Sequence, residues 1–388
     1  MADDGETALI GMPRDEGPSE LTRGSAFVFE RTDEEWRQQA KLVADDLSGV
    51  REFGEQLGLS GDGTTAVIGV SDPFEDSESP VGPFVFERTD AGWRQQADLI
   101  GEGSTEGDYF RSALAVSDDA TTVIVGASAD AVGANETGSG SAYVFDQTDG
   151  GWSQQAKLVP GDPDEADWFG ERVAVSGDGT IAIIGAPGEH YPNETDAPGD
   201  DDPSGTRNDV WPSAEGAAYV FEQTDEGWSQ QAKLAPKDDD LDDESGIPAI
   251  SSDGTTAFMG DYHGRGSVHV FEQTDTGWSK RAELTALDED NAYYDALSDI
   301  AVSNDGSMVM LGTPKDTEPM GVEGSASVFK HTDEGWSHRA KLAPDDSDAE
   351  DHIGTSIAMS SDGATALIGA PGDDNSNGED GGAVYVYE

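Results

Sequence analysis

The densest group of metal-type ligands in this sequence lies near its C-terminus, where residues 373–380 read Asp-Asp-Asn-Ser-Asn-Gly-Glu-Asp. Calcium is bound by six to eight oxygen atoms, which closely spaced carboxylates and amides supply. The run therefore predicts a calcium site, and calcium is the one cofactor that the sequence suggests. The predicted ligands are Asp373, Asp374, Asn375, Asn377 and Asp380. The alternative is that these residues are solvated acidic surface, because the chain has 81 acidic residues.

A second candidate site lies in a long acidic segment, residues 188–215. The segment holds eight acidic residues, one arginine and two large aromatic residues, Tyr191 and Trp211. A loop that only solvates the protein does not need such side chains, whereas aromatic rings give sugars and peptides a stacking surface. The predicted ligand-binding residues are Tyr191, Arg207 and Trp211. The alternative is that the two aromatic side chains pack this loop against the rest of the protein.

Patterns typical of catalysis are weak. The six histidines show no His-x-x-x-His or His-Glu-x-x-His spacing, and the sequence has no Gly-x-Ser-x-Gly motif and no glycine-rich phosphate loop. The absence of cysteine excludes cysteine nucleophiles, thiolate zinc sites, iron–sulfur clusters and disulfides. Two Asn-x-Thr triplets predict glycosylation at Asn135 and Asn193 and favour export. We predict no catalytic residues and a protein that is not an enzyme.

The charge of the chain limits its partners and indicates its habitat. With 21 basic and 81 acidic residues, the formal net charge is −60. This charge excludes nucleic acid and anionic membrane surfaces as partners, and no apolar run is long enough for a membrane span. Salt at about 1 M shortens the Debye length to about 3 Å and screens most of the repulsion. We therefore predict a halophilic protein of haloarchaeal type; the alternative is an acidic protein of ordinary ionic strength.

One unit of about 57 residues recurs along the chain. Its best-preserved part has the form Phe-x-x-Thr-Asp-x-x-Trp-x-x-x-Ala-x-Leu and begins at Phe29, Phe86, Phe145, Phe221, Phe271 and Phe329. Six of the eight tryptophans occupy the same position in this segment, which favours packing between repeats over a binding role. Three further elements recur, with the forms Phe-Gly-x-x-x-Ala-x-Ser, Thr-Ala-Leu-Ile-Gly-Ala-Pro and Gly-Ser-Ala-Tyr-Val-Phe. Each is a short β-branched or aromatic run bounded by turn residues, which predicts a strand.

Four antiparallel strands repeated about seven times are typical of a β-propeller. We predict an all-β fold, a seven-bladed β-propeller of four-stranded antiparallel blades. A single domain would cover residues 1–388, with the loop insertion at 188–215. The first blade lacks its first strand and the last blade its fourth, so both blades are incomplete. We expect the natural chain to begin upstream of Met1, with an export signal there.

The repeats resemble those of the FG-GAP family, which is related to the propeller of integrin α-subunits. The resemblance is carried by Phe169-Gly170 with Gly185-Ala186-Pro187, by Ile353-Gly354 with Gly369-Ala370-Pro371, and by the strands of the Gly-Ser-Ala-Tyr-Val-Phe type. It implies a propeller whose Phe-Gly strand is innermost and a role in adhesion. The integrin-type calcium loop, Asp-x-Asp-x-Asp-Gly, is longer than the Ser-Gly-Asp-Gly turns here, so these turns are not expected to bind calcium.

The two faces of such a propeller differ in their connections. The second-to-third and fourth-to-first loops share one face and are long, variable and acidic, whereas the opposite face has only tight turns. Variable loops on a rigid scaffold are where binding occurs. We predict a non-enzymatic, extracellular or cell-surface binding or adhesion protein that recognises a protein or glycan through the long-loop face. The alternative is a propeller hydrolase, lyase or quinone-dependent dehydrogenase, which would gather polar groups with shifted pKa values in the central channel.

Overall fold

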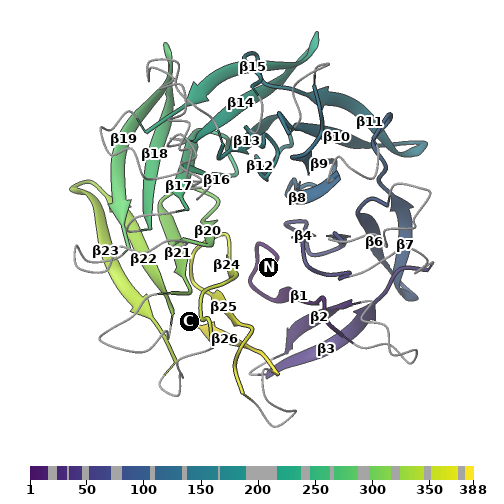
Figure 1. Cartoon of the computed structure of the whole chain (residues 1–388). Helices are drawn as coiled ribbons and strands as arrows, with labels where there is room; N and C mark the ends of the chain where they lie inside the picture. The colour runs from purple at the N-terminus through teal and green to yellow at the C-terminus, as the bar shows by residue number, and fades with distance from the viewer. Residues whose placement is uncertain are drawn as a thin grey trace, which may run out of the picture.

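In the computed structural model, the strands form seven sheets arranged around a central axis (Figure 1). The structure describes residues 1–15, 24–32, 35–45, 52–70, 81–104, 110–132, 138–164, 167–188, 216–236, 245–262, 266–286, 297–315, 324–344, 351–374 and 381–388. Within these ranges every helix or strand assigned is a β-strand. None of the described residues forms a helix with the length and apolar character that a membrane span needs.

Each sheet is one blade, and the blades follow one another in chain order. Blade 1 contains β1 (Thr7–Met12), β2 (Ser25–Thr32) and β3 (Glu35–Leu42), and blade 2 contains β4 (Leu57–Leu59), β5 (Thr65–Ile68), β6 (Phe84–Thr89) and β7 (Gly92–Asp98). Blade 3 contains β8 (Phe110–Val116), β9 (Thr122–Ala127), β10 (Ser141–Thr148) and β11 (Gly151–Leu158). Blade 4 contains β12 (Arg172–Val175), β13 (Ile181–Ala186), β14 (Ala217–Thr224) and β15 (Gly227–Leu234). Blade 5 contains β16 (Ser245–Ile250), β17 (Thr256–Asp261), β18 (Ser267–Thr274) and β19 (Gly277–Thr285). Blade 6 contains β20 (Asp299–Val302), β21 (Met308–Thr313), β22 (Ser325–Thr332) and β23 (Gly335–Leu342). Blade 7 contains β24 (Ile357–Met359), β25 (Ala366–Ala370) and β26 (Ala383–Tyr387).

Every blade is an antiparallel meander whose strands are paired in sequence order. Five sheets have four strands, and the sheets of blades 1 and 7 have three. The prediction of a seven-bladed propeller with incomplete first and last blades is therefore confirmed. The first strands of the complete blades lie closest to the central axis, and neighbouring ones lie side by side (Figure 1).

Apolar strands in the middle of each blade are buried on both faces, because each blade is packed between two others. Both central strands of blade 4 show this pattern, since β13 and the first five residues of β14 are buried throughout. The core between blades 3 and 4 contains Val144, Phe169, Tyr219 and Phe221, with the repeat tryptophan Trp228 packed against it. The Phe169 ring lies 5.5 Å from the ring of Tyr219 and 5.9 Å from that of Phe221. The structure thus places this tryptophan in the core between blades, as its repeated position predicted.

The turn between the first and second strands has a shared hydrogen-bond pattern in blades 2 to 7: an aspartate accepts bonds from the serine hydroxyl two residues before it and from the backbone N–H two residues after it. In blade 4, the Asp178 carboxylate accepts bonds from the Ser176 hydroxyl (2.8 Å) and from the backbone and hydroxyl of Thr180 (3.0 and 2.8 Å). The Ser176 hydroxyl in turn accepts the backbone N–H of Ile181 (3.0 Å). The corresponding aspartates are Asp62, Asp119, Asp253, Asp305 and Asp362. Such short side-chain bonds to the backbone fix a tight turn without a metal ion.

These turns also close the propeller. Seven backbone hydrogen bonds of 2.8–3.3 Å link each turn to the next and return to the first. The donor-to-acceptor pairs are Asp3–Gly61, Gly61–Asp118, Asp119–Gly177, Gly177–Ser252, Ser252–Asn304, Asn304–Ser361 and Ser361–Asp3. We call this set the turn ring. The turn of blade 1, residues 2–5, takes part in it although that blade has only three strands.

The segment that corresponds to Phe-Gly in blades 2, 4, 5 and 7 forms a parallel bridge with the blade before it. Gly140, at the start of the third strand of blade 3, forms a parallel bridge with Phe169 of blade 4. A Cβ atom on Gly126 would lie 1.9 Å from the carbonyl oxygen of Gly170, so only glycine fits there. The residue before the Phe-Gly pair adopts a left-handed conformation, with φ of 53° at Trp168. The resemblance to FG-GAP repeats implied the innermost position of this strand but not this interlock.

Candidate functional site

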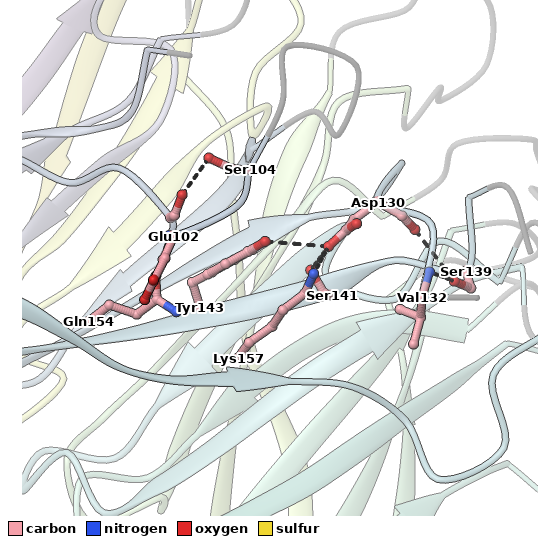
Figure 2. Close-up of polar contacts among 10 residues, drawn as sticks. Glu102, Ser104, Asp130, Val132, Ser139, Ser141, Tyr143, Gln154 and Lys157 are labelled. Carbon is pink, nitrogen blue, oxygen red and sulfur yellow. Dashed lines mark hydrogen bonds and ion pairs between the residues drawn. The ribbon is translucent and has the colours of Figure 1, made fainter. Parts of the chain in front are cut away.

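Three of the long connections leave the propeller from roots that are fixed by a buried or half-buried aspartate. In blade 3 the root is Asp130, which follows β9 and is only 6% exposed (Figure 2). One oxygen, Asp130 Oδ2, accepts a hydrogen bond from the Ser141 hydroxyl (2.5 Å), lies 2.5 Å from the Lys157 ammonium and lies 3.4 Å from the Tyr143 hydroxyl. The backbone carbonyl of Asp130 accepts the N–H of Gly140 at 2.9 Å. Both ends of the second-to-third loop are thereby tied together.

Electrostatics stabilise the charged pair at this root. Burial lowers the pKa of Lys157, but hydrogen bonds to Asp130 and Tyr143 outweigh burial, so its pKa lies above the ordinary value. The Lys157 ammonium also lies 5.2 Å from the centre of the Tyr143 ring. Burial raises the pKa of the Tyr143 hydroxyl, so Tyr143 stays neutral. The cluster is therefore a fixed ion pair that positions backbone; it does not offer a mobile proton.

The same construction recurs in other blades. In blade 1, Asp15 accepts bonds from the Ser25 hydroxyl (2.7 Å) and the Lys41 ammonium (2.5 Å). Burial raises the pKa of Asp15, and the bonds from Lys41 and Ser25 outweigh it, so the pKa lies below its ordinary value. In blade 7, the Tyr385 hydroxyl donates to Asp373, whose carbonyl accepts the N–H of Gly382 at 2.9 Å. We call Asp15, Asp130 and Asp373 the root aspartates.

Blade 5 builds the corresponding region from different groups. His269 stands at the strand position of Tyr143, and Glu283 stands at that of Lys157. His269 Nε2 lies 3.2 Å from Asp261 Oδ1, and both side chains are buried. The Ser245 hydroxyl donates to the same Asp261 oxygen. A hydrolase needs its serine hydroxyl beside the histidine, whereas here both the serine and the histidine bond to the aspartate. This cluster is therefore a structural variant of the root and lacks the geometry of a catalytic triad.

Trp168 is an exposed aromatic side chain on the long-loop face that sequence reasoning missed. It is 43% exposed and lies directly before the Phe169-Gly170 pair. The backbone N–H of Trp168 donates to the Gly138 carbonyl of blade 3 (3.0 Å), and the backbone carbonyl of Trp168 accepts the N–H of Glu171 (3.0 Å). The neighbouring Asp167 carbonyl accepts the N–H of Gly188, where the 188–215 insertion begins. A rigid, exposed indole thus stands at the root of the longest loop.

A second polar group gathers near the central axis, at the long-loop end of the inner strands. Arg172 of β12 lies 5.9 Å from the Tyr262 ring centre, and its guanidinium donates to the Glu171 carbonyl (3.2 Å). The pKa of Arg172 is raised, mainly by Tyr262, against the effect of burial, with smaller contributions from Glu171 and Asp299. Arg172 is therefore a permanent cation in this group.

Asp299 is the carboxylate of this group. We call Arg172, Tyr262 and Asp299 together the axial group. Its two oxygens accept the backbone N–H groups of Ile300 and Ile357, each at 2.9 Å. Burial raises the pKa of Asp299 to about 6, and the two backbone bonds and Arg172 only partly offset it. The inner strands of blades 4, 6 and 7 thus meet around one carboxyl whose pKa is shifted towards neutrality.

At the end of the axis formed by the turns, the carboxyl group of Asp118 has a raised pKa. The Ser252 hydroxyl donates to it from two blades away along the ring. Burial raises the pKa of Asp118, and the nearby carboxylates of Asp3 and Asp119 raise it further. Among the described residues, no group of three or more histidine, cysteine, aspartate or glutamate side chains could hold a metal ion.

Most residues that the sequence predicted for binding fall outside the described ranges. The ligand-binding set Tyr191, Arg207 and Trp211, the glycosylation sites Asn135 and Asn193, and the calcium ligands Asn375, Asn377 and Asp380 lie there. Asp373 and Asp374 are described, and Asp373 is a root aspartate bonded to Tyr385. This bond favours a structural role for Asp373; calcium binding by residues 373–380 stays a prediction.

A sequence signal for the root aspartates exists. Each lies four residues after the glycine of the second strand, at Gly11, Gly126 and Gly369. An acidic residue occupies the same offset in blades 4 and 6, at Glu189 and Asp316, which lie outside the described residues. The axial group has no such signal, because its members come from inner strands of different blades.

Comparison with protein families finds the FG-GAP repeat at residues 93–145, 152–221 and 336–387, a little under half of the chain. A search of curated proteins finds no match. The three matched segments cover parts of blades 2 to 4 and 6 to 7. Together with the seven-bladed architecture, they support an FG-GAP propeller, as the resemblance in the sequence implied.

Proposed function

We propose that this propeller with FG-GAP repeats is a non-enzymatic binding protein, of the extracellular or cell-surface type, that recognises a protein or a glycan through its long-loop face. The fold of the FG-GAP propeller is consistent with a binding role. Two further features support it: the turn face consists of the same short turns throughout, and the long connections rise from fixed roots on the other face. Loops held at both ends on a rigid scaffold are suited to recognition.

The observation that carries the proposal is the exposed Trp168 ring beside the 188–215 insertion. An indole at 43% exposure on a backbone fixed from both sides presents a preorganised stacking surface. Tyr191 and Trp211, which the sequence predicts as ligand-binding residues, follow in the insertion and lie outside the described residues. The ligand class that fits is a glycan ring or an aromatic-rich peptide segment.

A binding screen with a matched variant tests the proposal. The protein is applied in 3 M KCl, above the about 1 M salt that screens most of its charge repulsion, to arrays of glycans and of extracellular peptides. We expect Trp168→Ala to weaken any specific binding at least about tenfold, as for an aromatic hot spot.

His352→Ala is the control, because His352 occupies the same left-handed position before the Phe-Gly segment of blade 7, with φ of 54°. It should leave binding unchanged. Equal losses in the two variants would show that the position matters for folding and would contradict the assignment of Trp168. Absence of any ligand for the wild-type protein on both arrays would contradict the proposal itself.

The axial group favours a second candidate function, an enzyme with its site near the central axis. A carboxyl with a pKa of about 6 beside a permanent cation suits general acid–base chemistry. Turnover of chromogenic glycosides or esters by the wild-type protein, abolished in Asp299→Asn, would support the enzyme. Turnover unaffected by Asp299→Asn, or no turnover on either class of substrate, would leave the binding function as the better explanation.

A further inference from the structure

Blade 5 departs from the repeat at four positions that lie together at the long-loop end of its strands. One position comes from each strand, β16 to β19, and the residues there are Ser245, Asp261, His269 and Glu283. The corresponding residues of blade 4 are Phe169, Ala186, Tyr219 and Lys233. An aromatic pair and a lysine are thus replaced by a histidine between two acidic residues. We call the four residues of blade 5 the blade 5 cluster.

The inner part of the blade 5 cluster is closed to solvent. Asp261 is 1% exposed and His269 is 3% exposed, and Ser245 is also fully buried. A carboxylate removed from water to this degree needs a positive charge beside it, because an unpaired buried charge is strongly destabilising. Among the described residues, His269 is the one group in contact with Asp261 that can carry a positive charge.

Both ring nitrogens of His269 face carboxylates. Nε2 lies 3.2 Å from Asp261 Oδ1, and Nδ1 lies 3.8 Å from Glu283 Oε2. A neutral imidazole has an N–H on one nitrogen and a lone pair on the other, whereas the imidazolium ion has an N–H on both. The charged form therefore directs a proton at each carboxylate, and the neutral form directs a lone pair at one of them. Histidine also holds a proton more tightly than aspartate does in water, which favours a proton on the ring.

No other cation replaces His269 beside the buried carboxylate. Within the described ranges, Asp261 of β17 and Glu283 of β19 are the two ion-pair contacts of the ring, and β16 contributes the neutral Ser245 hydroxyl, which donates to Asp261. Lys280 of β19 contacts Glu283 Oε2 at 3.1 Å. The half-exposed Glu283 thus has a lysine as well as solvent, whereas Asp261 depends on the histidine.

The roots of blades 1 and 3 use lysine where blade 5 uses histidine. Lys41 contacts Asp15 and Lys157 contacts Asp130, each at 2.5 Å. A lysine ammonium keeps its charge up to about pH 10, whereas histidine is the side chain that changes its charge between about pH 5 and pH 8. Of these three roots, blade 5 is therefore the one whose cation is sensitive to a change of pH near neutrality.

We propose that the blade 5 cluster is a pH-sensitive switch, in which protonated His269 holds the four strands together at their long-loop end and its deprotonation loosens them. Deprotonation leaves Asp261 as a buried carboxylate whose described partner is the neutral Ser245 hydroxyl. The ends of β17 and β18 then separate, because opening returns this carboxylate to water. A histidine that is stabilised by carboxylates in the folded state contributes stability that is complete at low pH and is lost as the pH rises. The switch therefore opens in base.

The charge of His269 is measured by two-bond proton–nitrogen correlation NMR on the isotope-labelled full chain in 3 M KCl, which screens the charge repulsion. Its signals are identified by their absence in His269→Gln. We expect the pattern of an imidazolium ion, protonated on both nitrogens, at pH 7 and its loss as the pH rises to about 9. A neutral imidazole at pH 7 would overturn the proposal.

Amide hydrogen exchange locates the opening. After correction for the intrinsic pH dependence of exchange, protection of β17 and β18 should fall about tenfold between pH 7 and pH 9. The equivalent strands of blade 3, β9 and β10, are the internal control and should change by less than about twofold, because lysine is the cation of that root. Asp299, with a pKa of about 6, stays ionised throughout this range. Equal changes in blades 3 and 5 would contradict the switch.

Variants test the part that His269 plays in this response. His269→Gln keeps a polar side chain without a titratable proton and should abolish the fall in protection of blade 5. Asp261→Ala combined with His269→Tyr restores the residues of blade 4 and should abolish it as well, which also covers the case that His269→Gln does not fold. His352→Gln, at an exposed histidine of blade 7, is the matched control and should keep the fall of about tenfold. An unchanged response in the blade 5 variants, or its loss in His352→Gln, would assign the effect to another group.

Discussion

The two faces of the propeller use aspartate in opposite ways. On the turn face, Asp178 and its counterparts in blades 2 to 7 accept bonds from neutral donors, a serine hydroxyl and a backbone N–H, and in most of these turns also from a threonine or serine hydroxyl. On the long-loop face, the root aspartates Asp15 and Asp130 pair with lysine, Asp373 pairs with tyrosine, and blade 5 uses histidine. The turns thus keep one hydrogen-bond pattern around their aspartate in blades 2 to 7, whereas the carboxylates of the loop roots have different partners in different blades.

The largest expected effect is unfolding in acid, which should act through the aspartates of the turn face. Hydrogen bonds hold the pKa of Asp178, Asp253 and Asp305 below the ordinary value, and the same holds for Asp62 and Asp362. A carboxylate with a depressed folded-state pKa stabilises the fold above its unfolded pKa, and this contribution is lost as the pH falls through the folded pKa. We therefore expect cooperative unfolding below about pH 4, where all five turns weaken together. Circular dichroism in 3 M KCl from pH 7 to pH 2 measures it.

A control at the turns makes the acid prediction specific. A variant with three of these aspartates replaced by asparagine keeps acceptor oxygens that do not titrate. It should be less stable at pH 7 and lose less stability on acidification. An acid midpoint and slope identical to wild type would show that other carboxylates govern unfolding.

Removal of one root aspartate is the next largest effect. Asp130→Ala leaves the partly buried Lys157 without its counter-ion and Ser141 without its acceptor, so it should cost about 2–3 kcal/mol in the free energy of unfolding. Guanidinium unfolding measures the loss. Adding Lys157→Met to Asp130→Ala should recover part of it, because the uncompensated charge is then gone. A double variant no more stable than Asp130→Ala would contradict the ion-pair explanation.

One turn aspartate should matter less than one root aspartate. Asp178→Ala removes an acceptor from partly exposed neutral donors, which water can replace, so we expect a loss of about 1 kcal/mol. Asp178→Asn keeps one acceptor oxygen and should cost less. If Asp178→Ala were more damaging than Asp130→Ala, the ranking of the two faces would be reversed.

The effect of Asp299 is similar in size to that of one turn aspartate, about 1 kcal/mol, and has the opposite pH dependence to the turns. Its folded-state pKa of about 6 lies above the ordinary 3.8, so the folded state binds the proton more tightly. Stability should therefore gain a contribution as the pH falls from about 7 to about 5, before the turns begin to fail. The gain is measured by guanidinium unfolding at both pH values and should be absent in Asp299→Asn. An equal gain in that variant would assign the effect to another group.

The sequence was sufficient for the architecture because every blade repeats the same information. The count of strands, the incomplete first and last blades and the tight turns all follow from the spacing of the repeat. It also located the repeat tryptophans, whose identical setting indicated packing. Local patterns are informative wherever the structure is itself local.

The sites were less predictable because they combine distant residues. Arg172 and Asp299 come together only because the first strands of blades 4 and 6 surround one axis. Exposure of Trp168 depends on a left-handed backbone that a neighbouring blade holds through Gly138. The acidic neighbours of Asp373 predict a metal ligand, which stays a prediction, and the offset that Asp373 shares with Asp15 and Asp130 is the sequence signal for its role as a loop root. The aromatic residues of the insertion remain a prediction.

The turn ring has a consequence for how the chain folds. Six of its seven bonds join turns of consecutive blades, which can form one after another as the chain is synthesised. The last bond, from Ser361 to Asp3, joins opposite ends of the chain and must wait for the seventh blade. Its loop-closure entropy is the largest of the seven, since that cost grows with the separation along the chain. Blades 7 and 1 should therefore be the last to meet during folding and the first to part when the protein is pulled or heated.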